Sequence, residues 1–168
     1  LQPKTAIQFV GGHGRGKSSH LFALQKDLSD RLNHSIPYVR LRDPTDLPTG
    51  PIVLLDEGAH LYRRAWWRLR RVHSIAISTH ITLKPILWML GFSVQTVRIE
   101  NVRSAELRAI FERRLEWARR GAGPIPTLPE STLQTLLNQY GDDIRSMESA
   151  LYASIERLSG VDDVHLYT

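Results

Sequence analysis

The stretch "GGHGRGKSS" (residues 11–19) decides the fold that this sequence predicts. It follows an apolar run of strand length, "AIQFV" (6–10), and leads into a helical segment that begins at Lys17. Residues 11–18 match the phosphate-loop pattern G-x-x-x-x-G-K-[ST] in full, in the strand–loop–helix setting that the pattern requires. Glycines let backbone N–H groups turn inward around phosphate oxygens, where a Cβ atom would collide. The stretch therefore predicts a loop that binds nucleotide phosphates.

The side chains of this predicted loop have distinct expected tasks. Lys17 would reach the β and γ phosphates, and the hydroxyl of Ser18 would be a ligand of Mg²⁺. The helix that starts near Lys17 would add the positive end of its dipole. The alternative is a glycine-rich strand–helix turn with an exposed lysine. The residues expected to contact nucleotide are Gly11, Gly12, His13, Gly14, Arg15, Gly16, Lys17, Ser18 and Ser19.

Two acidic residues end the apolar run "PIVLLDE" (51–57). Asp56, at the strand end, would contact the bound nucleotide and hold the water shell of Mg²⁺ opposite Ser18. Glu57 would polarise the water that attacks the γ phosphate. An ordinary acidic turn is the alternative, but the phosphate loop upstream favours a catalytic pair.

Runs rich in Val, Ile and Leu alternate with helical segments up to Glu100, which is typical of a parallel sheet covered on both faces. The expected strands are 6–10, 36–41, 51–57, 74–79 and 94–100. We therefore expect an α/β core over residues 1–101, with a five-stranded parallel sheet flanked by helices.

Only helical patterns follow this core. One helix is expected from Ser104 to about Arg120, and a second opens with the capping-box spacing of Thr127 and Glu130. A third opens at Asp142 or Asp143. The sequence thus predicts a small helical subdomain over residues 102–168.

Together these motifs resemble the AAA+ ATPases over nearly the whole chain. Residues 11–18 correspond to the Walker A motif, and "IVLLDE" (52–57) corresponds to Walker B. "SIAISTH" (74–80) looks like the strand that ends in the sensor-one residue, for which Thr79 is the first choice and His80 the alternative. "GDDIRSMESAL" (141–151) resembles the sensor-two helix of the lid. The pattern is most similar to replication-initiator (origin-recognition type) and transposition-associated ATPases.

This resemblance implies a P-loop core with a helical lid, and an activity that hydrolyses ATP with Mg²⁺. It implies that Arg145 faces the γ phosphate and that Lys17, Glu57, Thr79 and Arg145 take part in catalysis. AAA+ proteins usually form rings or filaments with ATP at subunit interfaces. The expected partners are therefore ATP, further copies of the chain, DNA and a partner protein.

The sequence departs from the AAA+ pattern in three places. The segment before the first strand, which usually helps to enclose adenine, is reduced to "LQPKT" (1–5). Walker B and sensor one lie unusually close together. The helix after sensor one, "LKPILWMLGF" (83–92), contains no arginine, so the usual position of an arginine finger is empty. Arg113 and Arg114, or Arg70 and Arg71, are the alternatives, and hydrolysis would be slow or dependent on a partner without a finger.

Five arginines and two tryptophans crowd into "YRRAWWRLRR" (62–71). Arginines neutralise phosphates and a tryptophan can stack on a base, so this segment predicts contact with nucleic acid. On a helix, Arg63, Trp67, Arg70 and Arg71 would lie on or near one side. A solvated basic helix, or a surface between subunits, is the alternative. The residues expected to contact DNA are Arg63, Arg64, Trp67, Arg68 and Arg71.

Composition and missing motifs exclude several other classes. The formal net charge of +5 is compatible with a polyanionic partner, and the lack of cysteine excludes disulfides and thiolate metal sites. The longest apolar stretch, 75–92, is interrupted by charged residues and proline, and the chain starts without a signal-peptide pattern, so we expect a cytoplasmic protein with no membrane partner. The guanine motif N-K-x-D and the ABC-type LSGGQ are missing. A non-hydrolysing ATP-dependent scaffold and, less favoured, a small P-loop kinase remain as alternatives.

Overall fold

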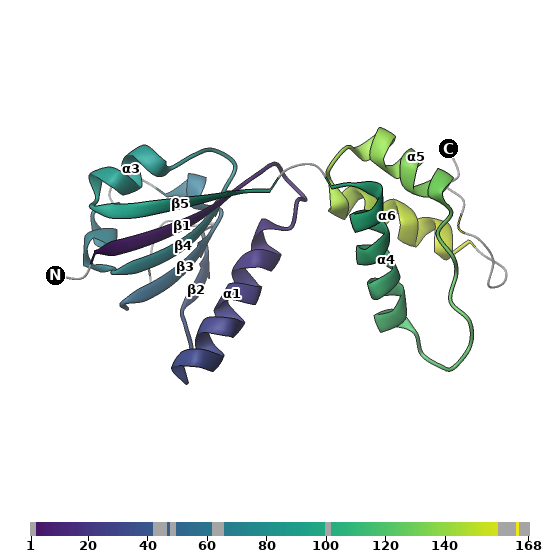
Figure 1. Cartoon of the computed structure of the whole chain (residues 1–168), viewed down its shortest axis with the longest axis horizontal. Helices are drawn as coiled ribbons and strands as arrows, with labels where there is room; N and C mark the ends of the chain where they lie inside the picture. Colours follow the sequence, from purple (N-terminus) through teal and green to yellow (C-terminus); the bar gives the residue numbers. More distant parts are fainter. Residues whose placement is uncertain are drawn as a thin grey trace. The chain divides into compact units, whose positions relative to one another are not determined.

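The first part of the chain is built on five parallel strands, as the computed structural model shows (Figure 1). Their order across the sheet is β2-β3-β4-β1-β5, and every neighbouring pair is parallel. The expectation of an α/β fold with a five-stranded parallel sheet flanked by helices is confirmed. The strands are β1 (Lys4–Val10), β2 (Tyr38–Arg40), β3 (Ile52–Asp56), β4 (Ser74–Thr79) and β5 (Phe92–Arg98).

The structure describes residues 3–41, 47, 50–61, 66–99, 102–157 and 164. The chain separates into two compact units, Leu1–Ile99 and Glu100–Thr168. The sequence places the boundary between residues 101 and 102, and Glu100 and Asn101 lie outside the described residues. Among the described residues, no helix is both long enough and apolar enough to cross a membrane.

The two faces of the sheet bury different side chains because successive residues of a strand point to opposite faces. Leu54 and Ala76 pack with Leu21 of helix α1 (Lys17–Leu32). Their neighbours along the same strands belong to the opposite cluster, which is larger. Leu87 of helix α3 (Lys84–Met89) and Leu69 of the 3-10 helix η2 (Arg68–Arg71) belong to that cluster, together with Val53, Leu55, Ile75, Ile77 and Phe92.

The carboxyl edge of the sheet collects the predicted nucleotide motifs. β1 leads into the phosphate loop, β3 into the acidic pair, and β4, which pairs with both β1 and β3, into Thr79 and His80. The backbone N–H of Gly11 donates to the carbonyl of Thr79 at 3.3 Å, which joins the ends of β1 and β4. In parallel α/β sheets, ligands bind beyond the carboxyl ends of the strands. Sheet order therefore brings together motifs that are far apart in sequence.

The second unit consists of helices α4 (Ser104–Ala118), α5 (Glu130–Tyr140) and α6 (Ile144–Ile155). Leu107, Phe111, Leu136 and Met147 are among the buried residues of its core. α6 begins after Asp143, whose carboxylate accepts the backbone N–H of Ser146 at 3.1 Å, as a capping aspartate should. The expected capping box of α5 does not form, because the helix begins at Glu130 with Pro129 as its N-cap.

Candidate nucleotide-binding site

The predicted phosphate loop runs from Gly11 to Gly16, between β1 and α1. Gly14 and Gly16 have φ angles of 71° and 78°, in the left-handed region that favours glycine. Gly16 is the N-cap of α1, and its carbonyl accepts the backbone N–H of His20 at 3.1 Å. The side chain of Arg15 donates to the carbonyl of Ile99 at 3.2 Å and fastens the loop to the end of β5. These glycines are thus required by the backbone path at the start of the helix.

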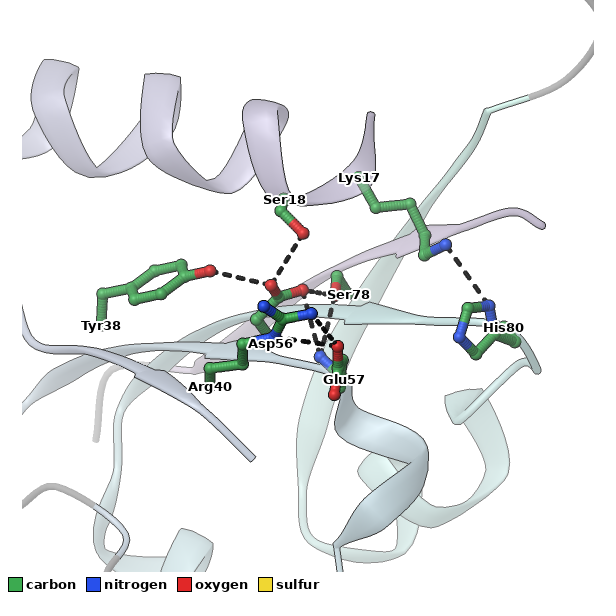
Figure 2. Close-up of polar contacts among 8 residues, drawn as sticks. All are labelled: Lys17, Ser18, Tyr38, Arg40, Asp56, Glu57, Ser78 and His80. Atoms are coloured by element: carbon green, nitrogen blue, oxygen red, sulfur yellow. Dashed lines mark hydrogen bonds and ion pairs between the residues drawn. The ribbon is translucent and has the colours of Figure 1, made fainter. Parts of the chain in front are cut away.

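The side chain of Lys17 lies over this loop and is buried, which is unusual for a lysine. Its ammonium group donates to the carbonyl of Gly12. The ammonium nitrogen also lies 3.3 Å from Nδ1 of His80 (Figure 2). A buried lysine that faces the loop backbone can donate hydrogen bonds to phosphate oxygens. The alternative, a glycine-rich turn with an exposed lysine, does not fit the burial of Lys17.

Asp56 is the centre of a hydrogen-bond network (Figure 2). Its Oδ2 accepts the hydroxyl of Ser18 at 2.7 Å and the hydroxyl of Tyr38 at 2.8 Å. Its Oδ1 accepts the hydroxyl of Ser78 and, at 3.1 Å, the backbone N–H of Glu57. The two motifs, 38 residues apart in sequence, therefore meet through a direct contact of their side chains.

The network keeps Asp56 ionised. Burial raises the pKa of Asp56, but the hydrogen bonds from Ser78, Ser18 and Tyr38 outweigh burial and hold the pKa below its ordinary value. The hydroxyl of Ser18 donates its hydrogen bond to this carboxylate, so the lone pairs of the Ser18 oxygen remain available for another partner. Burial, together with the bond to Asp56, raises the pKa of Tyr38, so its hydroxyl remains a donor.

Glu57 has a backbone φ of 61°, which is uncommon for a residue with a side chain. Its N–H donates to the hydroxyl oxygen of Ser78 at 3.0 Å, which supports this conformation. Its carboxylate accepts two hydrogen bonds from the guanidinium of Arg40, one of them from Nε at 2.9 Å. The predicted water-activating group is therefore ion-paired with a strand residue.

Three of these contact residues were missed by the sequence analysis: Tyr38, Arg40 and Ser78. A signal for the first two exists, since polar residues two apart on a strand share one face. Tyr38 and Arg40 lie on β2, beside β3, and both reach the acidic pair (Figure 2). Ser78 precedes the expected sensor by one residue and carries no comparable signal.

The two candidates for sensor one have different surroundings. The hydroxyl of Thr79 donates to the carbonyl of Ile81 at 2.9 Å, so this buried side chain serves its own turn. His80 instead faces the loop, where its Nδ1 lies 3.2 Å from the carbonyl oxygen of Gly11. The ring of His13 lies against it, with 3.8 Å between centroids. Of the two candidates, the structure brings His80 to the phosphate loop.

The surroundings of His80 favour the neutral ring. Burial lowers the pKa of His80, and the ammonium of Lys17 lowers it further, against a raising effect of the Gly11 carbonyl. A neutral imidazole beside an ammonium group can change its charge when an anion arrives.

The remaining predicted site residues lie elsewhere. Ser19 is exposed on the first turn of α1. Arg145 is exposed on the first turn of α6, in the second unit, so its contact with the γ phosphate remains a prediction. Among the arginines considered as a finger, Arg114 pairs with Glu148.

The basic segment is only partly described, since Arg63 and Arg64 lie outside the described residues. Arg68 and Arg71 belong to η2, a short 3-10 helix, so the expected α-helical side over these positions is not formed there. Because η2 precedes β4, Arg68 and Arg71 lie at the amino edge of the sheet, opposite the predicted phosphate loop.

A comparison with protein-family models finds no match for this chain, and a search of curated proteins finds no significant relative.

Proposed function

We propose that this chain binds ATP with Mg²⁺ and hydrolyses it, as an ATPase of the AAA+ type. The observation that carries the proposal is the 2.7 Å hydrogen bond from Ser18 to Asp56, beside the buried Lys17. This contact joins the phosphate loop to the acidic strand end, in the way that phosphate-loop enzymes hold a metal ion beside a triphosphate. A glycine-rich turn without a ligand has no need of such a contact.

The residues present fit a nucleotide-bound magnesium ion. Mg²⁺ prefers oxygen ligands and usually takes one or two protein groups plus phosphates, which Ser18 and Asp56 can provide. The bound ion would neutralise charge on the β and γ phosphates. The loop N–H groups and Lys17 would bind the phosphates, while Asp56 would orient the Ser18 hydroxyl.

Hydrolysis requires Glu57 to accept a proton from water, and Arg40 competes for its carboxylate. This ion pair favours a second candidate function, a switch that binds ATP and turns it over slowly or only with a partner. No contact among the described residues favours a kinase that transfers the γ-phosphoryl group to a small molecule. In either form we infer an oligomer that acts on DNA with a protein partner, and a helical second unit that serves as a lid through Arg145.

The test is ATP binding measured by calorimetry, with phosphate release measured on the same samples. Lys17→Ala should abolish binding, whereas Lys26→Ala, an exposed lysine paired with Asp30, should not. Glu57→Gln should bind ATP and Mg²⁺ but release no phosphate. Tight binding by Lys17→Ala would refute the site, and wild-type turnover by Glu57→Gln would remove Glu57 from catalysis. Binding without turnover in the wild type, even with DNA, would establish the switch.

A further inference from the structure

The amino edge of the sheet carries a concentration of exposed aromatic and cationic side chains. Trp67, Arg68, Arg70 and Arg71 are all exposed there, and we call them the Trp67 cluster. Trp67 exposes 61% of its surface. Between them, Leu69 is 1% exposed and packs in the sheet core. The cluster is therefore displayed on a segment that is anchored in the core.

Within this cluster, the guanidinium of Arg70 lies over the ring of Trp67. The guanidinium carbon of Arg70 lies 4.2 Å from the ring centroid of Trp67, a cation–π contact. The ammonium of Lys4, the first residue of β1, donates to the carbonyl of Arg70 and adds a further cation to the same edge. Within the part of the chain that the structure describes, neither Arg70 nor Arg71 forms an ion pair with a carboxylate. The exposed ring of Trp67 thus lies beside the positive charges of Arg70 and Arg71, which no carboxylate among the described residues neutralises.

A hollow of about 620 Å³ opens beside the ring. Its volume lies within the range of sites that hold small organic groups. The base of an unpaired nucleotide is a planar group of that kind, with a face that any aromatic ring can stack on. Among the residues that the structure describes, those that line the hollow are Leu47, Gly50, Trp67, Arg68, Leu69, Arg71 and Val72.

We propose that the Trp67 cluster binds single-stranded DNA. One base stacks on Trp67 at the hollow, and the arginines contact the flanking phosphates. A duplex is disfavoured because its base faces are covered by neighbouring bases, whereas single strands are bound by stacking plus a positive surface. The choice of DNA over RNA rests on the proposed function, and oligouridylate is the probe that tests it.

This proposal rests on the proposed function only in taking DNA as the partner. Its test is carried out without ATP. Its failure would leave the nucleotide site untouched, and loss of the nucleotide site would leave this binding intact. The measurement is fluorescence anisotropy of a labelled oligothymidylate with the full chain, across a salt series.

Trp67→Ala should weaken binding by roughly 5- to 150-fold, while Trp67→Phe should retain most of the affinity because the ring is kept. Arg70→Ala with Arg71→Ala should weaken binding and reduce the salt slope by about 0.7 for each lost phosphate contact. Trp117→Ala, which removes another exposed tryptophan, and Lys84→Ala with Arg120→Ala, which makes the same change in charge, should leave binding unchanged.

Wild-type affinity in a folded Trp67→Ala variant would overturn the proposal, and so would equal losses in the control variants. Circular dichroism establishes the fold, and if Trp67→Ala unfolds, an unchanged affinity and salt slope in a folded Arg70→Ala, Arg71→Ala variant would overturn the proposal instead. If duplex DNA binds as tightly as oligothymidylate or more tightly, the assignment to single strands is overturned. If oligouridylate does so, the assignment to DNA is overturned. Unchanged affinity with a changed particle mass would make the cluster a subunit interface instead.

Discussion

The ring of His80 predicts that nucleotide binding takes up a proton. Burial and the ammonium of Lys17 lower the pKa of His80, and His13 acts in the same direction while Glu57 opposes it. The ring is therefore neutral at neutral pH in the protein alone. Phosphates bound by the loop would bring negative charge beside the ring and favour its charged form. ATP should consequently bind more tightly as the pH falls.

The sign and size of this effect follow from linkage. The complex binds more protons than the free protein when the pH lies between the lowered pKa of the free ring and the higher pKa of the ring beside phosphate. Inside this window, affinity should rise by up to about tenfold per pH unit, because one imidazole takes up one proton. Above the window the ring is neutral in both states, and below it charged in both, so affinity becomes constant.

The assay is calorimetric titration of ATP with saturating Mg²⁺ between about pH 6 and 8, where histidine normally titrates. Two buffers of different ionisation enthalpy report the number of protons taken up. His80→Gln should lose the uptake that wild type shows, whereas His34→Gln, an exposed histidine beyond α1, should keep it. Protonation of ATP itself is common to all three proteins. Equal proton uptake in wild type and His80→Gln would refute the reasoning.

Three further substitutions test the network and the core. Tyr38→Phe removes a donor to Asp56, the carboxylate of the proposed metal site, so half-maximal phosphate release should need roughly tenfold more Mg²⁺, and an unchanged requirement would contradict this role. Arg40→Ala frees Glu57 from a surface ion pair, so turnover should rise a few-fold at most; a fall in turnover would mean that the pair orients the carboxylate for catalysis. Gly58→Ala would place a Cβ atom 2.3 Å from a buried isoleucine side chain, so urea unfolding should show a loss of about 1–3 kcal/mol, and an unshifted midpoint would show that the core can adjust.

The contact of Ser18 with Asp56 was predictable because each motif fixes its own backbone. A phosphate loop must follow a strand and open a helix, and an acidic residue at the end of another parallel strand must point to the same edge. The five-strand parallel sheet followed from the same alternation of apolar runs and helices. Local sequence was sufficient for these parts.

The partners of the acidic pair were not predictable in the same way. Tyr38 and Arg40 reach the pair only because β2 lies beside β3, and sheet order is a property of the whole fold. For a related reason, the sequence could not show which of Thr79, the first choice for sensor one, and His80 faces the loop. Thr79 is the last residue of β4 and His80 follows it, so an uncertainty of one residue exchanges a buried side chain for one that faces the loop.

Two central strands, β4 and β1, connect the two proposed sites at their opposite ends. β4 begins just after the Trp67 cluster and ends at His80, while β1 begins at Lys4, which bonds Arg70, and ends at the phosphate loop. Strands of this length span about 20 Å, and each belongs to the buried sheet. A shift at either end would therefore displace core contacts shared by both sites. If the sites are coupled, reciprocity requires that DNA change the affinity for ATP by the same factor by which ATP changes the affinity for DNA. Both factors can be measured with Glu57→Gln, in which turnover is expected to be blocked. If the two affinity changes differ at equilibrium, one titration reports a different site. If neither ligand changes the affinity for the other, the strands separate the two sites without coupling them.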